Sequence, residues 1–145
     1  MLRFFSEDIK FSLPEKPQTR TWLKELAAQE GFKIGELNYI FCSDDYLLQV
    51  NRDHLDHDYY TDIITFDNSE DEDRLEGDIF ISVDRVRDNA QTLNVPEEQE
   101  LRRVLAHGLL HLSGYGDKTE TEATEMRRKE EEALAAWSAY QIKKA

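Results

Sequence analysis

Two histidines and one aspartate in the segment HGLLHLSGYGD have the side-chain types and the spacing of a metal-binding site. His107 and His111 lie four residues apart, and Asp117 follows six residues later. On a helix this spacing places both imidazole rings on one face, one turn apart. Gly114 can end that helix and Gly116 can let the chain turn back. The carboxylate of Asp117 can then approach the same ion.

Two imidazoles and one carboxylate suit a single Zn²⁺ ion whose fourth coordination position stays open for water. The alternative is a pair of core or surface histidines followed by an ordinary helix C-cap, because a bare HxxxH pattern recurs by chance. Leucines nearly surround the helix, so we expect it to be buried, where imidazoles need polar partners. Gly108 stands where HExxH metallopeptidases have their glutamate base, which argues against that mechanism.

The elements that must position these residues follow from periodicity along the 145-residue chain, which we expect to form one domain, 1–145. The class predicted is α/β (α+β): a small mixed β-sheet packed by about five helices, with the metal site at the end of a buried helix. Alternating apolar residues predict strands within 3–13, 36–43, 61–66 and 77–83, and helical periodicity predicts helices over 19–31, 44–55, 84–93, 97–113 and 119–140.

Three capping signals mark where helices begin. Ser43 precedes the second helix, and Asn94 with Glu97 forms an apparent capping box before the histidine helix. Thr119 with Glu122 forms another before the last helix. That helix is expected to bury a stripe of Ala123, Met126, Ala133, Trp137 and Tyr140.

The composition restricts the partners and the compartment. The chain has 18 basic and 31 acidic residues, a net charge of −13, which opposes nucleic-acid binding overall. An RNA substrate would therefore need a local basic cluster or a metal ion. A single cysteine, Cys42, excludes an intrachain disulfide and suits a reducing compartment. Without an apolar membrane-length run or a signal-peptide core, we expect a cytoplasmic protein with no membrane association.

Three motifs resemble those of one known family, the YbeY family of bacterial endoribonucleases. The segment HGLLHLSGYGD is similar to the family's H-G-x-L-H-L-x-G-Y-D-H, LDHDYYTDIITF to D-x-P-T-D-V-L-S-F, and GDIFISVDRVRDNA to its G-D-I-x-I strand and following helix. Their order and spacing agree over residues 51–117. The resemblance implies a cytoplasmic, single-strand-specific, metal-dependent endoribonuclease acting in 16S rRNA 3′-end maturation and ribosome quality control. Its expected partners are single-stranded RNA or rRNA and the ribosome or a small-subunit precursor.

The chain departs from the family pattern at three positions. Family members carry zinc on three histidines; His107 and His111 match the first two, and Asp117 replaces the third. Tyr60 replaces the family's proline before Thr61. Leu55 lies at the position of an arginine that is taken as important for catalysis in the family. These departures affect the expected mechanism more than the expected metal site.

Two arginines are the catalytic candidates. Arg52 lies one helical turn before Leu55 and could replace the missing arginine, and Arg103, four residues before His107, could stabilise developing charge. A basic patch for RNA could come from Arg102, Arg103, Arg85, Arg87 and residues 127–129, although each of these is more often paired with a neighbouring glutamate.

Other polar residues have simpler interpretations. His54 and His57 could bind RNA or a second ion, but solvated residues at a helix end are the favoured interpretation. Asp62 is expected to cap or orient the site loop, with a catalytic base as the less favoured alternative, and Asp78 is expected to make a structural hydrogen bond.

Two further functions compete with the endoribonuclease. One is a metallohydrolase of another substrate, such as a peptide or small ester. The other is a non-catalytic, metal-binding ribosome-assembly factor, which Leu55 and the acidic charge favour. RNA cleavage that EDTA abolishes and zinc restores would separate the first function from the last.

Overall fold

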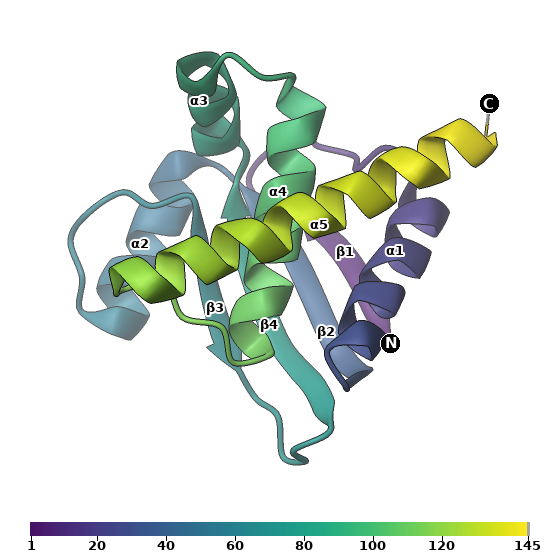
Figure 1. Ribbon diagram of the computed structural model, residues 1–145. Coiled ribbons are helices and arrows are strands. Elements are labelled where there is room, and N and C mark those ends of the chain that lie inside the picture. Colours follow the sequence, from purple (N-terminus) through teal and green to yellow (C-terminus); the bar gives the residue numbers. More distant parts are fainter. Residues whose placement is uncertain (145) are drawn as a thin grey trace.

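The computed structural model describes the backbone of residues 1–144 and the side chains of residues 1–139. Within that part, a four-stranded sheet has the order β1-β2-β4-β3, with β1, β2 and β4 parallel and β3 antiparallel to β4. The mixed sheet and the five helices confirm the predicted class (Figure 1). The elements are β1 (Leu2–Ser6), α1 (Lys16–Gln29), β2 (Lys33–Cys42), α2 (Asp44–Leu55), β3 (Ile63–Asp67), β4 (Arg74–Ser82), α3 (Val83–Leu93), α4 (Glu97–Leu112) and α5 (Glu120–Lys144).

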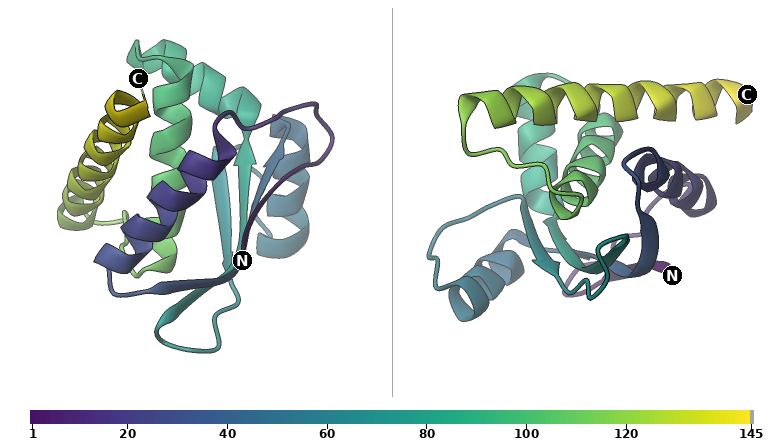
Figure 2. Two further views of the ribbon diagram at one scale, coloured as in Figure 1. Left: turned by 90° about the vertical axis from the view of Figure 1, so that its right-hand side faces the viewer. Right: turned by 60° about the horizontal axis from the view of Figure 1, so that its bottom comes forward.

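Helices cover both faces of the sheet. Helices α1, α4 and α5 lie on one side and α2 lies on the other, as the right-hand view of Figure 2 shows. Helix α4 packs on β3 and β4, and α5 crosses its outer side (Figure 1). Because α4 is enclosed between the sheet and α5, its leucines are buried nearly all round, as predicted.

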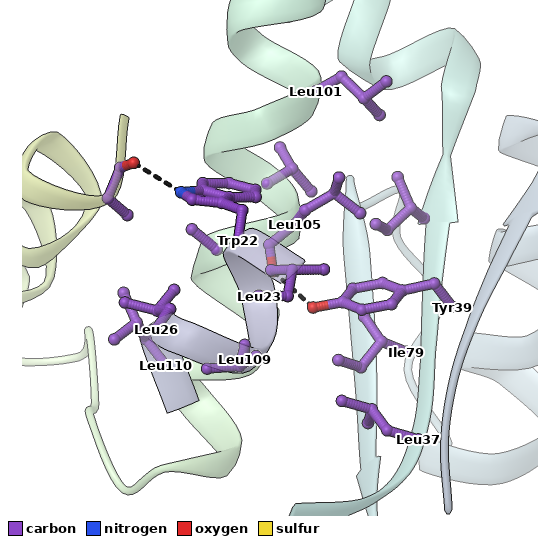
Figure 3. Close-up of a cluster of buried hydrophobic side chains, with 14 of the residues drawn as sticks. Trp22, Leu23, Leu26, Leu37, Tyr39, Ile79, Leu101, Leu105, Leu109 and Leu110 are labelled. Carbon is purple, nitrogen blue, oxygen red and sulfur yellow. Dashed lines mark hydrogen bonds between the residues drawn. The ribbon is translucent and has the colours of Figure 1, made fainter. Parts of the chain in front are cut away.

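Strand β2 shows how the alternation in the sequence serves this arrangement. Leu37, Tyr39 and Phe41 belong to the main core on the α4 side, and Cys42 joins Leu47 of α2 in a second cluster on the other side. The Tyr39 hydroxyl donates a hydrogen bond of 2.8 Å to the Leu105 carbonyl of α4 (Figure 3). Sheet and helix are thereby joined at a buried point next to the leucine-rich interface.

Two of the three predicted caps form. The Ser43 hydroxyl accepts from the Tyr46 N–H, and Thr119 exchanges hydrogen bonds of 3.1 Å with Glu122. The prediction for Asn94 was wrong. It adopts a left-handed conformation (φ 56°) and ends α3, while Pro96 precedes α4. Asparagine tolerates that conformation, so it serves the preceding helix instead of the following one.

Helix α5 is fixed to the rest of the domain by its apolar stripe. Met126, Ala133 and Trp137 are buried as predicted, Ala123 is partly buried, and the side chain of Tyr140 lies outside the described residues. The Trp22 indole N–H donates a hydrogen bond of 2.8 Å to the Ala133 carbonyl (Figure 3). This contact joins α5 to α1 at a buried point.

At Gly108, α4 lies close against side chains of β3 and β4. A Cβ added there would lie 2.9 Å from Ile63 Cδ1 and 3.0 Å from Ile79 Cγ2. The glycine in the middle of a helix, which costs about 1 kcal/mol relative to alanine, therefore has a packing reason.

Gly108→Val is expected to lower the free energy of unfolding by about 2 kcal/mol, because the branched side chain must displace Ile63 and Ile79. Urea denaturation measures the change. Ala139→Val, at an exposed position of α5, controls for the helix propensity of valine. Equal effects of the two substitutions would contradict the close packing.

Candidate metal centre

The structure brings the three predicted metal ligands together. One carboxylate oxygen of Asp117, Oδ2, lies 3.5 Å from Nε2 of His107 and 3.3 Å from Nε2 of His111. The candidate donor atoms of the three residues all lie within 4.8 Å of one another. The two rings are nearly perpendicular, with centroids 4.5 Å apart. Both histidines therefore present the same nitrogen to the aspartate.

The turn after α4 places Asp117 in this position. The helix ends at Leu112, and Gly114 adopts φ 107°, a conformation that favours glycine, as predicted for the helix end. Gly116 was expected to let the backbone turn back, but the structure gives a different reason for a glycine here. A Cβ there would lie 2.3 Å from a carboxylate oxygen of Glu122, so the absent side chain leaves room for the capping box of α5.

Tyr115 anchors the same turn. Its hydroxyl donates a hydrogen bond of 2.5 Å to Glu30, which also pairs with Lys129 of α5 at 2.9 Å. Burial and this hydrogen bond raise the pKa of Tyr115. The turn that carries Asp117 is thus attached both to the end of α1 and to α5.

Glu130 is a site residue that the sequence reasoning missed. Its Oε2 lies 2.5 Å from Nδ1 of His107, on the side of the ring that faces away from Asp117. Glu130 is 5% exposed. The sequence did contain a pattern that could have identified Glu130. It lies on the apolar stripe of α5, four residues after Met126 and three before Ala133. A carboxylate on a buried stripe requires a partner.

Arg103 lies behind Glu130. Its guanidinium donates two hydrogen bonds of 2.7 Å to Glu100 and approaches Glu130 at 3.2 Å and Asp62 at 3.8 Å. The hydrogen bonds that Arg103 donates to Glu100 are the main cause of the raised pKa of Arg103. These carboxylates occupy the guanidinium, and the catalytic role of Arg103 stays a prediction.

Arg52 lies on α2, on the other side of the sheet, and its side chain is 47% exposed and paired with Asp58. Its catalytic role stays a prediction. Leu55, at the family's arginine position, is 39% exposed. His54 and His57 are exposed, in agreement with their favoured interpretation as solvated residues at a helix end.

The two aspartates of the strand region make structural contacts. Asp78 accepts a hydrogen bond of 3.0 Å from Asn38, which confirms its predicted role. Asp62 accepts a hydrogen bond of 3.3 Å from Asn89, and its carbonyl accepts one from Ser82. These contacts agree with an orienting role for Asp62.

The structure agrees with the alternative that these basic residues pair with neighbouring carboxylates, not with the basic patch that they could have formed. The side chain of Arg102 is fully buried, with its guanidinium 4.3 Å from the centre of the Trp137 ring. The other basic residues pair with carboxylates because the chain has an excess of acidic residues. The pairs are Arg85–Asp44, Arg87–Glu97, Arg103–Glu100, Arg128–Glu125 and Lys129–Glu30. Arg127 is exposed.

The donor set fits a divalent metal. Three donor atoms from a helix and its following turn face one another, and the second nitrogen of one imidazole is held by a carboxylate, an arrangement found around histidine ligands. Asp117 is 42% exposed on its side chain, so solvent reaches the cluster. The fold and the cluster together define a small α/β domain with a candidate metal centre at the end of a buried helix.

The chain belongs to the YbeY family, as the three motifs predicted. The family profile described as Endoribonuclease YbeY matches residues 5–138. The Endoribonuclease YbeY of Cytophaga hutchinsonii is 61% identical over 132 residues, which cover 91% of this chain and 92% of that protein. That of Phocaeicola vulgatus is 50% identical, covering 93% of this chain and 97% of that protein. The solution structure of TM1509 from Thermotoga maritima superposes with a TM-score of 0.69 at 26% identity, covering 99% of this chain and 93% of that one.

Tyr115→Phe is expected to destabilise the protein by about 1 kcal/mol, because it removes a hydrogen bond to a charged group that keeps a second partner in Lys129. Urea denaturation and amide hydrogen exchange at residues 114–117 measure the effect on the fold and on the turn. Tyr59→Phe, at an exposed position, is the control. Unchanged exchange in the turn would show that Tyr115 does not anchor it.

Proposed function

We propose that this protein is a metal-dependent endoribonuclease that cleaves single-stranded RNA, acting in the maturation of the 16S rRNA 3′ end and in ribosome quality control. The observation that carries the proposal is the convergence of His107, His111 and Asp117 in a chain of the YbeY family. The names of its relatives, Endoribonuclease YbeY, support the reaction class.

The proposed cofactor is one Zn²⁺ ion held by Nε2 of His107, Nε2 of His111 and a carboxylate oxygen of Asp117. Two imidazole nitrogens and one carboxylate oxygen form a set that zinc accepts, with a further position left for a substrate or water. When bound, the ion would supply a Lewis acid for a phosphate oxygen or activate water for hydrolysis. The protein itself holds these donor atoms together at the end of α4, where solvent has access to them.

The proposed RNA substrate is held with little help from surface cations. The basic residues expected to form a patch are paired or buried, apart from the exposed Arg127. Arg52 is a candidate phosphate ligand, since exchange of its exposed ion pair with Asp58 costs little. The proposed setting is the cytoplasm, with the ribosome or a small-subunit precursor as partner. Among the described residues, no helix is long and apolar enough to cross a membrane.

A non-catalytic assembly factor is the second candidate, because Leu55 replaces the arginine that the family resemblance marks as catalytic. This protein would bind zinc and the small-subunit precursor but leave single-stranded RNA intact. A metallohydrolase of another substrate would instead cleave a peptide or a small ester in a metal-dependent manner.

We expect protein purified without a histidine tag to contain one zinc ion per chain, and His107→Ala and Asp117→Ala to bind zinc at least about 100-fold more weakly, because each removes a ligand. Elemental analysis and competition with a chromophoric chelator measure content and affinity. His57→Ala, an exposed histidine outside the cluster, is the control. Equal zinc in all four proteins would refute the ligand assignment.

We expect cleavage of a single-stranded RNA oligonucleotide that EDTA abolishes and added zinc restores, with the matched duplex left intact. Because few cations are free, binding should depend weakly on salt, with a log–log slope of about −2, as for contacts to about three phosphates. Gel-based cleavage and fluorescence anisotropy measure both. Cleavage that persists at full rate in His107→Ala would point to a contaminating nuclease and would refute the proposed site.

A further inference from the structure

We propose that Glu130 is a positioning residue for the metal centre: it fixes the tautomer of His107, and Arg103 and Glu100 hold it in place. The inference rests on the proposed metal site and goes beyond it, because Glu130 lies on a different helix from both histidines and does not face the cluster. The contact that carries it is the 2.5 Å approach of Glu130 Oε2 to His107 Nδ1.

The tautomer matters because a neutral imidazole carries one N–H and one lone pair. A carboxylate only accepts hydrogen bonds, so Glu130 requires the proton of His107 to sit on Nδ1. The lone pair is then on Nε2, the nitrogen that faces Asp117 and His111. The same hydrogen bond also fixes the ring orientation, as in carboxylate–histidine–metal arrangements.

Glu130 is itself fixed by two further groups. Its Oε1 lies 3.2 Å from Nη1 of Arg103, whose other nitrogens are bound to Glu100, and Glu100 is 1% exposed. Two further contacts hold the neighbouring turns of α5. Lys129 donates a hydrogen bond to Glu30, and the Trp22 indole donates one to the Ala133 carbonyl. The carboxylate of Glu130 has little freedom to leave the histidine.

The charges of this network also favour a dication. Asp62, Glu100 and Glu130 surround the single guanidinium of Arg103, so three carboxylates share one positive charge and the formal charge behind His107 is −2. Asp117, on the metal side, adds one more negative charge. Carboxylates that are buried and incompletely neutralised are costly, and a divalent ion at the cluster would offset that cost.

Glu130→Gln tests the positioning role with a side chain of the same size. The natural carboxylate accepts from Arg103 at Oε1 (3.2 Å) and, at a longer distance, at Oε2 (3.4 Å), and it accepts from His107 at Oε2. A glutamine has one accepting oxygen, so its NH₂ group must face one of those two donors. If the amide faces His107, the ring must accept on Nδ1 and carry its proton on Nε2, which removes the lone pair from the metal side. If it faces Arg103, the network that holds residue 130 is broken.

We expect Glu130→Gln to weaken zinc binding about 10- to 100-fold, as measured by chelator competition. Glu131→Gln, the exposed neighbour on α5, removes the same charge without the contact and should bind zinc like the natural protein. Glu130→Asp keeps the charge but shortens the side chain, and it should also weaken binding. Circular dichroism and thermal melting establish that the variants remain folded.

The second readout is the histidine tautomer. In ¹⁵N NMR spectra of the zinc-free natural protein, where no ion holds Nε2, His107 should carry its proton on Nδ1, and Glu130→Gln should shift the ring to a mixture of tautomers. Equal zinc affinity and an unchanged tautomer in Glu130→Gln would overturn the inference. So would an equal loss in Glu131→Gln, or full affinity in Glu130→Asp. If the natural protein itself binds no zinc, the proposed metal site fails, an outcome distinct from failure of the positioning role alone.

Discussion

The enclosure of α4 between the sheet and α5 is the constraint on which the rest of the structure depends. One side of the helix packs on β3 and β4 so closely that a Cβ at position 108 would crowd Ile63 and Ile79. Its outer side is covered by α5, which crosses it (Figure 1). The histidines of the last two turns stand where this cover ends, so His107 is shielded on one side by Glu130 while its other nitrogen faces the turn with Asp117.

The acidic composition shapes both the surface and the interior. Outside the site, carboxylates pair with arginines and lysines that would otherwise be available to phosphates, as Arg85, Arg87 and Arg128 show. Inside, the same surplus places Glu100 and Glu130 around Arg103. A protein of net charge −13 thus concentrates its attraction for an RNA phosphate in few places, of which a bound dication would be the strongest.

The replacement of the family's third histidine by Asp117 is consistent with the local geometry. A carboxylate is shorter than an imidazole, so the turn must bring its backbone closer to α4. Gly114, in its left-handed conformation, and the Tyr115–Glu30 contact hold the turn there. The aspartate also brings a negative charge, whereas a histidine ligand is neutral, which strengthens the attraction for a dication.

The sequence by itself determined the features that depend on local spacing. Periodicity along the chain predicted the mixed sheet and the five helices, and the spacing of His107 and His111 with the glycine at 114 predicted the cluster with Asp117. These succeeded because helix and strand geometry convert sequence separation directly into side-chain direction. Asn94 was the exception, since one asparagine between two helices can serve the end of one or the start of the other.

Only the tertiary structure decided which distant residues complete the site. Glu130 and His107 are 23 positions apart on helices that cross, and their contact depends on the angle and rotation of α5, which the Trp22 hydrogen bond helps to set. The same holds for the arginines: Arg102 and Arg103 are neighbours in sequence, yet one packs on Trp137 and the other joins Glu100 and Glu130. Residues adjacent on a helix point about 100° apart, so the packing around α4 determined their different roles.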